Sequence, residues 1–263
     1  MLNDQKPERL LVGVSPVEIA KLDVINVWST IQGEGPFAGV LSTFVRLAGC
    51  NLKCPLCDTQ YTKGRRQFSI PDLVSQIALV QRPVPLYGRP IGVTKYSVNP
   101  LVVITGGEPF RQPNVFHLIE ALLDGGFSVQ VETNGTTAGD AKFLSKLHSE
   151  YGGTHKRRVA FTVVCSPKAV KVSDSLLPHI DCWKYVMECD QVHAEDGLPS
   201  SVLGSNFMPA RPPLNTPPQD IYLQPVDVQD PQRNDLHLKA VVKSCMTFGY
   251  RLGVQLHKLI GVE

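Results

Sequence analysis

Residues 50–57 read CNLKCPLC, which places Cys50, Cys54 and Cys57 on one short loop with the spacing C-x3-C-x2-C. No fourth cysteine or histidine lies near enough in the sequence to join them. Proteins usually hold a four-iron cluster with four thiolates, so three thiolates leave one iron open to a small molecule. The spacing therefore favours an open iron–sulfur cluster. Two alternatives are a zinc site, which normally has four ligands in a structural role, and core cysteines that meet by coincidence.

A small molecule on the open iron would define the chemistry. If it is S-adenosylmethionine, its amino and carboxylate groups bind the iron and place the sulfonium beside the cluster. One electron then cleaves the S–C5′ bond and releases a 5′-deoxyadenosyl radical, one of the hard chemistries that cofactors supply. The total of seven cysteines is odd and argues against a closed disulfide framework. Cys182 and Cys245 lie in apolar patterns and are expected to be buried.

Length and composition are typical of one large α/β domain. The chain has 263 residues, 43% of them hydrophobic, and a net charge of +2 with dispersed basic residues. This charge gives no sign of a nucleic-acid surface. We find no apolar run of about 18 residues and no apolar signal segment among residues 1–9. We therefore expect a cytoplasmic protein without a membrane segment.

Short apolar runs alternate with helical patterns and predict parallel strands covered by helices, with most strands apolar on both faces. The predicted strands are 24–28, 43–48, 101–105, 127–132, 159–164, 183–187, 221–223 and 252–255. The predicted helices are 70–78, with Ser69 as its N-cap, 114–124, 140–148 and 233–248. Residues 1–22 are expected to form an extension, as an added strand or a flexible arm, outside a core domain of residues 23–263. Two proline-rich stretches, 82–99 and 190–218, are expected to be insertions or lids.

Polar motifs recur where the predicted strands end. They are Arg46 with Cys50, TGGEP at 105–109, ETNGT at 132–136, CSPK at 165–168 and QPVD at 224–227. In a parallel βα barrel the carboxyl ends of the strands form one rim, and active sites lie there. Glycine, proline and asparagine also mark ordinary turns, but five motifs in register favour an enzyme.

Individual motifs allow more than one role. The main chain at 106–107 can approach a charged methionine moiety because glycine lacks a Cβ. Glu132 and Asn134 suit ribose hydroxyls, although an Asn-Gly turn explains them equally well. Ser166 and Lys168 could bind a carboxylate or hydroxyl, or could belong to a solvated loop.

Arg46 lies in a strand pattern, where a buried guanidinium needs a partner. A substrate carboxylate is the natural bidentate partner, and an internal Asp or Glu is the alternative. The run TIQGEG at 30–35 ends the first strand, and its Gln and Glu side chains could read the edge of a guanine-like or pterin ring. Asp58 and Thr59 could help to hold a hard cation through oxygen.

With these motifs in place, the chain resembles the radical S-adenosylmethionine superfamily and, within it, the 7-carboxy-7-deazaguanine synthases. The resemblance runs from about residue 23 to the C-terminus through TIQGEG, FVRL at 44–47, the cysteine loop to Thr59, GGEP, ETNGT, SPK and QP. It implies a modified, incomplete parallel βα (TIM-like) barrel. It also implies a lyase that converts 6-carboxy-5,6,7,8-tetrahydropterin to 7-carboxy-7-deazaguanine with release of ammonia, in queuosine-type biosynthesis.

The resemblance also implies site residues. Cys50, Cys54 and Cys57 would bind a 4Fe–4S cluster, and Thr59 would bind Mg²⁺. Substrate contacts are implied for Ile31, Gln32, Gly33, Arg46, Thr105 and the C-terminal carboxylate of Glu263. S-adenosylmethionine contacts are implied for Leu56, Cys57, Asp58, Gly107, Ser166, Pro167, Lys168, Gln224, Pro225, Val226 and Asp227. The cofactor-derived radical is the expected catalyst, with no catalytic side chain beyond it.

The expected partners are the small pterin, a flavodoxin- or ferredoxin-like one-electron reductant and a second copy of the chain in a homodimer. One rival is another radical enzyme such as a glycyl-radical activase, whose protein substrate would not need a pocket for a small carboxylated ring. The other rival is a non-catalytic iron–sulfur or zinc protein. An electron carrier would use four protein ligands and would not need five rim motifs.

Overall fold

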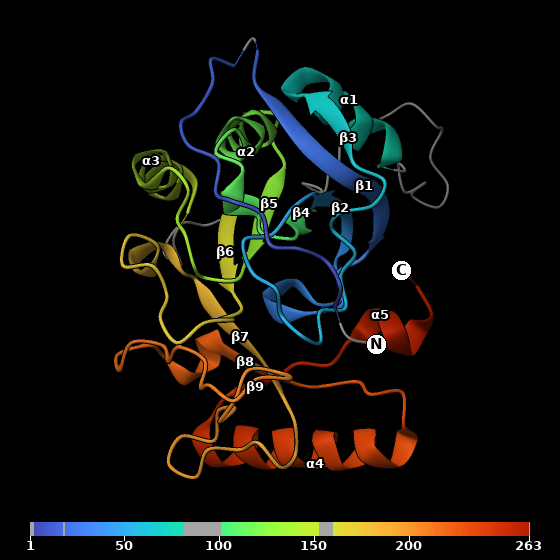
Figure 1. Ribbon diagram of the computed structural model, residues 1–263, viewed down its shortest axis with the longest axis vertical. Helices are drawn as coiled ribbons and strands as arrows, with labels where there is room; N and C mark the ends of the chain where they lie inside the picture. Colours follow the sequence, from blue (N-terminus) through green and yellow to red (C-terminus); the bar gives the residue numbers. More distant parts are fainter. Residues whose placement is uncertain (1–2, 18, 82–100, 153–159, 263) are drawn as a thin grey trace, which may run out of the picture.

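A single mixed sheet forms the centre of the molecule. The computed structural model describes residues 3–17, 19–81, 101–152 and 160–262, and within them the strand order is β3-β1-β2-β4-β5-β6-β7-β8-β9 (Figure 1). The strands are β1 Lys21–Ile31, β2 Leu41–Leu47, β3 Arg66–Ser69, β4 Leu101–Gly106, β5 Ser128–Thr133, β6 Phe161–Cys165, β7 Cys182–Met187, β8 Ile221–Pro225 and β9 Arg251–Leu252. Neighbours from β2 to β9 are parallel, whereas β1 is antiparallel to both β2 and β3. The predicted α/β class and mostly parallel sheet are confirmed.

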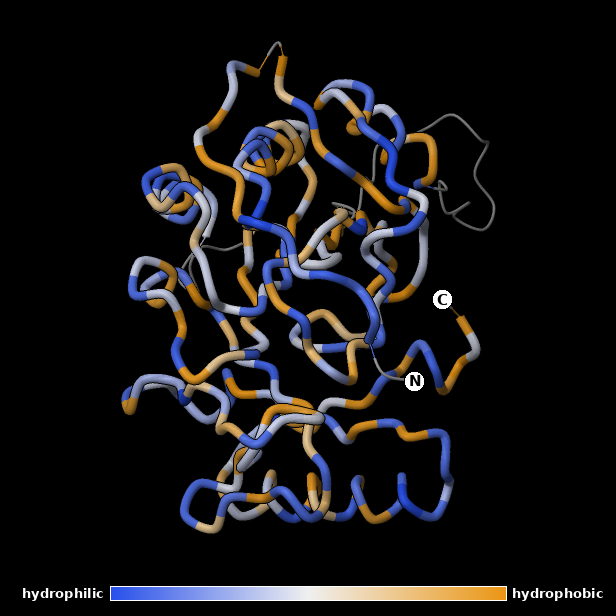
Figure 2. Tube along the Cα trace, viewed as in Figure 1, coloured by the Kyte–Doolittle hydropathy of each residue, from blue (hydrophilic) through white to orange (hydrophobic). Residues whose placement is uncertain are grey.

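Four of the five α-helices in the described residues, α1 to α4, pack on one face of this sheet. The five helices are α1 Ile70–Val80, α2 Val115–Asp124, α3 Ala141–Tyr151, α4 Pro231–Phe248 and the short α5 Leu256–Ile260. Ser69 caps α1 as expected, with its hydroxyl accepting a hydrogen bond from the Asp72 amide at 3.3 Å. Apolar residues of α1, α2, α3 and α4 join one core cluster with the sheet, and hydrophobic and hydrophilic residues alternate along α4 (Figure 2). None of the described helices is long and apolar enough to cross a membrane.

Alternate residues of the parallel strands face opposite sides of the sheet. The outer set packs under the helices and includes Val45 and Leu47, Val102 and Ile104, Val129 and Val131, Trp183 and Tyr185, and Ile221 and Leu223. The inner set faces the concave side, which we call the lumen, and includes Arg46, Thr105, Gln130, Glu132, Lys184 and Gln224. The expectation that most strands are apolar on both faces holds for the outer face, whereas the inner face is mixed. Val164, Cys182 and Tyr222 form a small apolar cluster on the inner face beside its polar side chains.

The first strand runs against its neighbour. The predicted strand 24–28 lies within β1, but the carboxyl end of β1 at Ile31 pairs with Leu41 at the amino end of β2. The TIQGEG run therefore starts beside the amino end of β2, but its Gln32 and Glu34 side chains reach Glu132 and Gln224 in the rim motifs at the carboxyl ends of β5 and β8. A hydrogen bond of 3.1 Å from the Leu256 amide to the Gly33 carbonyl ties this run to the segment after β9. No strand pair joins β3 to β9 in the described residues. The barrel is therefore open, as expected for an incomplete βα barrel.

Several boundaries differ from those predicted. The last strand is shorter than 252–255, β3 and α5 were not predicted, and part of the predicted strand 159–164 lies outside the described residues, as does the insertion 82–99. Residues 190–218 contain little regular structure, but Leu198 and Ala210 join the core cluster. The division into an extension and a core domain stays a prediction.

Candidate active site

Glycines position the cysteine loop against the end of β4. Gly107 donates to the Leu47 carbonyl at 3.2 Å, and a Cβ on Gly107 would lie 2.1 Å from the carbonyl oxygen of Gly49. A Cβ on Gly106, whose φ is +136°, would lie 2.2 Å from the Leu47 carbonyl oxygen. The GGEP motif therefore requires glycine for close backbone packing on the loop that begins at Cys50, whatever ligand its main chain binds.

The three loop cysteines are free thiols in a partly desolvated place. Burial raises the pKa of Cys50 to about 12 and also raises the pKa values of Cys54 and Cys57. The Leu52 amide lies 3.4 Å from the Cys50 sulfur and the Asn134 amide nitrogen 3.8 Å from it, as donors to a thiolate would. No group of three or more His, Cys, Asp or Glu side chains suited to one metal ion occurs in the described chain. Three free thiols on one short loop fit a cluster, in which each cysteine binds a different iron.

The buried Glu108 joins two rim motifs behind the loop. Its carboxylate accepts from the Thr133 hydroxyl at 2.8 Å and from the backbone amide of Asn134 at 2.7 Å. Burial raises the pKa of Glu108 to about 7, although these hydrogen bonds act to lower it. Asn134 in turn donates to Asn51 at 3.1 Å. Asn134 thus contacts the cysteine loop through its side chain, while its suggested role toward ribose hydroxyls stays a prediction.

A buried ion pair lies inside the lumen, at a place that we call its floor. Lys184 Nζ lies 2.5 Å from Glu34 Oε2, and the Glu34 carboxylate also accepts from Gln224 at 3.1 Å and Gln255 at 2.9 Å. Burial opposes ionisation of Glu34, but the Lys184 charge and the hydrogen bonds from these three side chains lower its pKa to about 2. Burial likewise opposes the Lys184 charge, and the carboxylates of Glu132 and Glu34 outweigh it and raise the pKa of Lys184. Both groups are therefore charged.

Glu132 lies beside this pair and gathers donors from other strands. Its carboxylate is 3.7 Å from Lys184 Nζ and accepts from Gln32 at 3.3 Å, Gln130 at 3.0 Å and Thr105 at 3.3 Å. Two of these donors, Gln32 and Thr105, were predicted to contact substrate. The structure thus brings the TIQGEG run and the end of β4 together around one carboxylate inside the lumen.

Arg46 lies in the lumen without a carboxylate partner in the part of the chain that the structure describes. Its guanidinium carbon lies 4.8 Å from the ring centroid of Trp28, and its Nε is buried without a hydrogen-bond partner. Thr30 Oγ1, Gln130 Oε1 and Gln224 Oε1 are also buried and unpaired. Buried polar atoms normally find partners, so these atoms mark a place where a polar ligand fits.

The remaining rim residues fall into two groups. Lys168 lies near the cysteines, because its charge opposes the rise in the pKa of Cys54 and Cys57. Leu56 is exposed beside Gly204 of the 190–218 stretch, and the Thr59 hydroxyl donates to Asp58 at 3.1 Å. In contrast, the Asp227 carboxylate is engaged internally: the Gln229 amide, Lys258 at 3.0 Å and Asn234 lower its pKa to about 2.

The C-terminal segment approaches the floor of the lumen. A Cβ on Gly33 would lie 2.0 Å from His257 Nδ1, so this glycine allows α5 to pack on the TIQGEG run. Glu263, which was predicted to contact substrate, lies outside the described residues.

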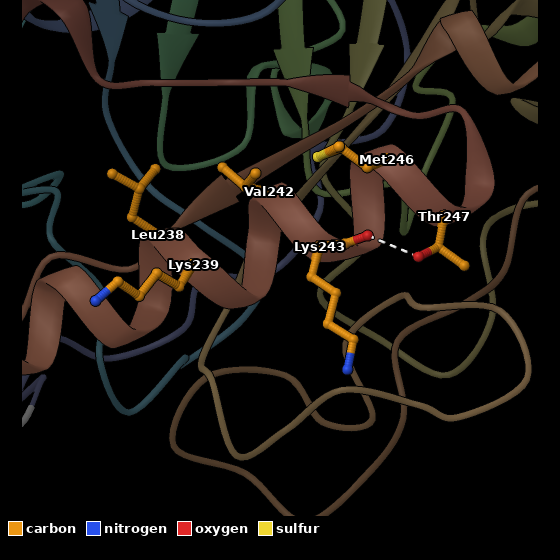
Figure 3. A pocket seen from close by; sticks show the side chains of 6 residues that line it. All are labelled: Leu238, Lys239, Val242, Lys243, Met246 and Thr247. Carbon is orange, nitrogen blue, oxygen red and sulfur yellow. Dashed lines mark hydrogen bonds between the residues drawn. The ribbon is translucent and has the colours of Figure 1, made fainter.

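A surface hollow on α4 does not belong to this site. It has a volume of about 540 Å³ and is lined by Leu238, Lys239, Val242, Lys243, Met246 and Thr247 (Figure 3). Its side chains are largely aliphatic, and the three cysteines and the charged groups of the lumen lie elsewhere. We therefore place the candidate active site in the lumen and at its rim.

Sequence reasoning missed Lys184, and it assigned its partners Glu34 and Glu132 to ligand contacts instead of to this ion pair. The signal was available, because Lys184 interrupts the strand sequence CWKYVM just as Arg46 interrupts its own strand. A charge inside a buried strand needs a partner, and here Glu34 and Glu132 supply it.

Comparisons with known proteins follow the same motifs. No family model matches the chain. A 7-carboxy-7-deazaguanine synthase of Rhodospirillum rubrum is 36% identical over 258 residues, covering 95% of this chain and 96% of the relative. The enzyme of the same name from Rickettsia prowazekii is 34% identical over 248 residues, covering 92% and 89%. A crystal structure of QueE from Escherichia coli has a TM-score of 0.56 at 23% identity, covers 90% of this chain and 95% of that chain, and has a similar fold.

Replacing Lys184 by Met should lower the free energy of unfolding by about 3–5 kcal/mol near pH 7, since two buried carboxylates lose their cation. In this variant burial of Glu34 is opposed only by amide hydrogen bonds, so its pKa should rise above the ordinary value of 4.5. A carboxyl group with a raised folded pKa costs stability above its unfolded pKa and not below it. Urea unfolding should therefore show a deficit that shrinks as the pH falls from about 7 to about 4.

The control is Lys171→Met, because Lys171 pairs with Asp174 while both side chains are exposed. This change should alter stability little at either pH. A Lys184→Met deficit of equal size at both pH values would show that Glu34 is not held ionised by Lys184.

Proposed function

We propose, from the premise that this chain belongs to the 7-carboxy-7-deazaguanine synthase family, that it converts 6-carboxy-5,6,7,8-tetrahydropterin to 7-carboxy-7-deazaguanine with release of ammonia. The chain is an enzyme of the radical S-adenosylmethionine lyase type, for which a 4Fe–4S cluster and S-adenosylmethionine are expected. The observation that carries the proposal is the lumen itself. It presents Arg46, whose Nε is buried and unpaired, and the unpaired amide oxygens of Gln130 and Gln224, and the loop at its rim carries three free cysteines.

The lumen offers complementary groups to a carboxylated pterin. The Arg46 guanidinium can donate two parallel hydrogen bonds to the carboxylate, and the Trp28 ring packs against one side of the guanidinium. Gln32 and Thr105 already donate to Glu132 and can donate to ring acceptors in the same place. Ile31 and Gly33 would complete the contacts from the TIQGEG run. Lys184 pairs with Glu34 and lies 3.7 Å from Glu132, so one cation faces two carboxylates beside the place proposed for the pterin.

The rim residues would hold the cofactors. Cys50, Cys54 and Cys57 would bind the cluster. S-adenosylmethionine would contact Leu56, Cys57, Asp58, the main chain of Gly107, Ser166, Pro167, Lys168 and the run Gln224, Pro225, Val226 and Asp227. When bound, the two cofactors supply a carbon-centred radical. The protein positions the pterin below them and excludes water through the packed lumen walls. The internal contacts of Asp227 favour a backbone contact at that residue.

Magnesium is the third proposed cofactor. Thr59 lies directly after the cysteine loop and offers a half-buried hydroxyl oxygen next to the Asp58 carboxylate. Mg²⁺ keeps several waters and commonly binds one or two protein oxygens together with an anionic substrate group. The substrate carboxylate would be that group.

Three finer points complete the proposal. The product would enter queuosine-type biosynthesis in the cytoplasm, a flavodoxin- or ferredoxin-like protein would supply electrons, and the chain would act as a homodimer.

The experiment that tests the function is anaerobic reconstitution with iron and sulfide, then incubation with reductant, S-adenosylmethionine and the pterin. Formation of 5′-deoxyadenosine excludes an electron carrier or zinc module. Stoichiometric ammonia excludes an activase of a protein substrate, and its absence would contradict the proposal.

Replacing Cys54 by Ala should abolish the spectroscopic signal of the 4Fe–4S cluster, because the described residues offer no nearby spare ligand. Iron content and the visible absorption band of reconstituted protein measure this. Cys245→Ala is the control, since Cys245 packs in the hydrophobic core and should affect stability without removing iron. Full iron loading of the Cys54→Ala protein would refute the ligand assignment.

Replacing Thr59 by Val keeps the side-chain shape but removes the hydroxyl oxygen. Turnover should therefore lose most of its stimulation by magnesium, while iron content stays unchanged. Thr247→Val on α4 is the control, because that hydroxyl only bonds the Lys243 carbonyl of its own helix. An unaltered magnesium response in the Thr59→Val enzyme would mean that Thr59 is not a ligand.

Replacing Arg46 by Ala should weaken pterin binding by on the order of 2–4 kcal/mol, the cost of leaving a partly buried charge unpaired. This corresponds to roughly 30- to 1000-fold in affinity. Arg46→Lys should restore little, because an ammonium cannot reproduce the guanidinium fork. Equilibrium binding of the pterin to reconstituted protein, with the reductant left out so that no turnover occurs, gives the affinity. The iron content of both variants should equal that of the parent.

Arg66→Lys is the matched control for Arg46, since Arg66 also stacks on an aromatic ring, at 5.4 Å from Phe68, but on the exposed strand β3. This variant should bind the pterin like the parent. Unchanged affinity in both Arg46 variants would show that the substrate carboxylate is bound elsewhere.

A further inference from the structure

The N-terminal residues lie along the cysteine loop and bond to its backbone. Asn3 donates through its amide to the Pro55 carbonyl at 2.9 Å and through its side chain to the Cys54 carbonyl at 3.0 Å. Gln5 Nε2 donates to the Thr59 carbonyl at 2.9 Å, and the Glu8 amide donates to the Cys50 carbonyl at 2.6 Å. Four carbonyl oxygens within residues 50–59 thus take their hydrogen bonds from residues 3–8.

Gln5 binds the loop in both directions. While its nitrogen donates to Thr59, its Oε1 accepts from the Tyr61 amide at 2.8 Å and from the Thr62 hydroxyl at 3.1 Å. The Tyr61 side chain is fully buried, and its hydroxyl donates to the Leu52 carbonyl at 3.3 Å. A single side chain therefore fixes the place where the loop leaves the last cysteine.

Glu8 fixes the place where the loop begins. Its carboxylate bridges Arg65 and Arg111, with Oε2 at 2.6 Å from Arg111 Nη2. The Arg111 side chain is only 6% exposed, so it depends on this carboxylate for its charge. The bridge packs on Gly49, directly before Cys50: a Cβ there would lie 2.9 Å from both Glu8 Oε2 and Arg111 Nη1.

The segment has an inner and an outer side. Asn3, Gln5 and Glu8 are half-buried against the loop, whereas Asp4 and Lys6 are exposed and form no hydrogen bond or ion pair within the described ranges. Backbone carbonyls of an irregular loop need partners, because the loop has no ladder of its own. The inner side supplies these partners, so the segment is built for the loop it covers.

We propose that residues 3–9 form a strap that positions the cysteine loop and slows the loss of iron from it, with Asn3, Gln5 and Glu8 as positioning residues. The inference rests on the proposed function for the identity of the metal centre, but the contacts of the strap do not depend on that identity. It assigns a role to the N-terminal extension that neither the motifs nor the comparisons give.

Three variants of the full-length protein test the strap. Gln5→Met removes both the donor to Thr59 and the acceptor for Tyr61. Gln5→Glu removes the donor, keeps the acceptor and lowers the net charge by one. Lys6→Gln is the control, since it also lowers the net charge by one but lies on the outer side.

Two readouts distinguish the contacts. Hydrogen exchange of the Tyr61 amide in iron-free protein should be about tenfold faster in Gln5→Met, while Gln5→Glu and Lys6→Gln resemble the parent. After reconstitution, a ferrous chelator should extract iron about tenfold faster from both Gln5 variants than from Lys6→Gln. Thermal unfolding of the four proteins checks that the fold as a whole is retained.

Extraction of iron at the rate of the parent in both Gln5 variants would overturn the strap, as would unchanged Tyr61 exchange in Gln5→Met. If the parent itself takes up no iron, the proposed function fails, and Tyr61 exchange alone then decides whether the strap holds the loop.

Discussion

The buried charge of Lys184 organises the open barrel. A lysine inside a protein requires carboxylates around it, and Lys184 obtains them from Glu34 after β1 and Glu132 on β5. Glu34 is in turn bonded by Gln224 on β8 and Gln255 after β9. The first and last strands are therefore linked by side chains inside the lumen, whereas no strand pairing joins them in the described part of the chain. The same side chains line the lumen, so the contacts that join the first and last strands also build the candidate site.

The cysteine loop meets the same requirement at the rim of the barrel. Its backbone is irregular and partly buried, and its partners come from two sides: the glycines of GGEP and Asn134 from the sheet, and the N-terminal strap from outside. The carbonyl oxygens of Cys50, Leu52, Cys54, Pro55 and Thr59 are hydrogen-bonded, around three thiols in a partly desolvated place. In the proposed function the lumen and the loop form one chamber, with Arg46 in its wall and the three cysteines at its rim.

The sequence was informative where chemistry is local. The cysteine spacing, the Ser69 cap and the motifs at strand ends each follow from a few neighbouring residues, and the structure describes most of them at the ends of parallel strands. The hydrophobic period was less informative about the direction of each strand and about which side of the sheet its side chains face. An apolar run such as that of β1 looks the same whether the strand pairs in a parallel or an antiparallel way. Lys184 and Glu34 are 150 residues apart, so no local pattern joins them. The strap binds carbonyl oxygens, which carry no side-chain signature.

The measurement that tests the chamber most directly is a crystal structure of the reconstituted protein, grown without oxygen in the presence of S-adenosylmethionine and 6-carboxy-5,6,7,8-tetrahydropterin. The account predicts the pterin ring inside the lumen near Gln32, its carboxylate within hydrogen-bonding distance of Arg46, and a cluster above it on Cys50, Cys54 and Cys57. A pterin bound outside the lumen, or a cluster held by other cysteines, would contradict it.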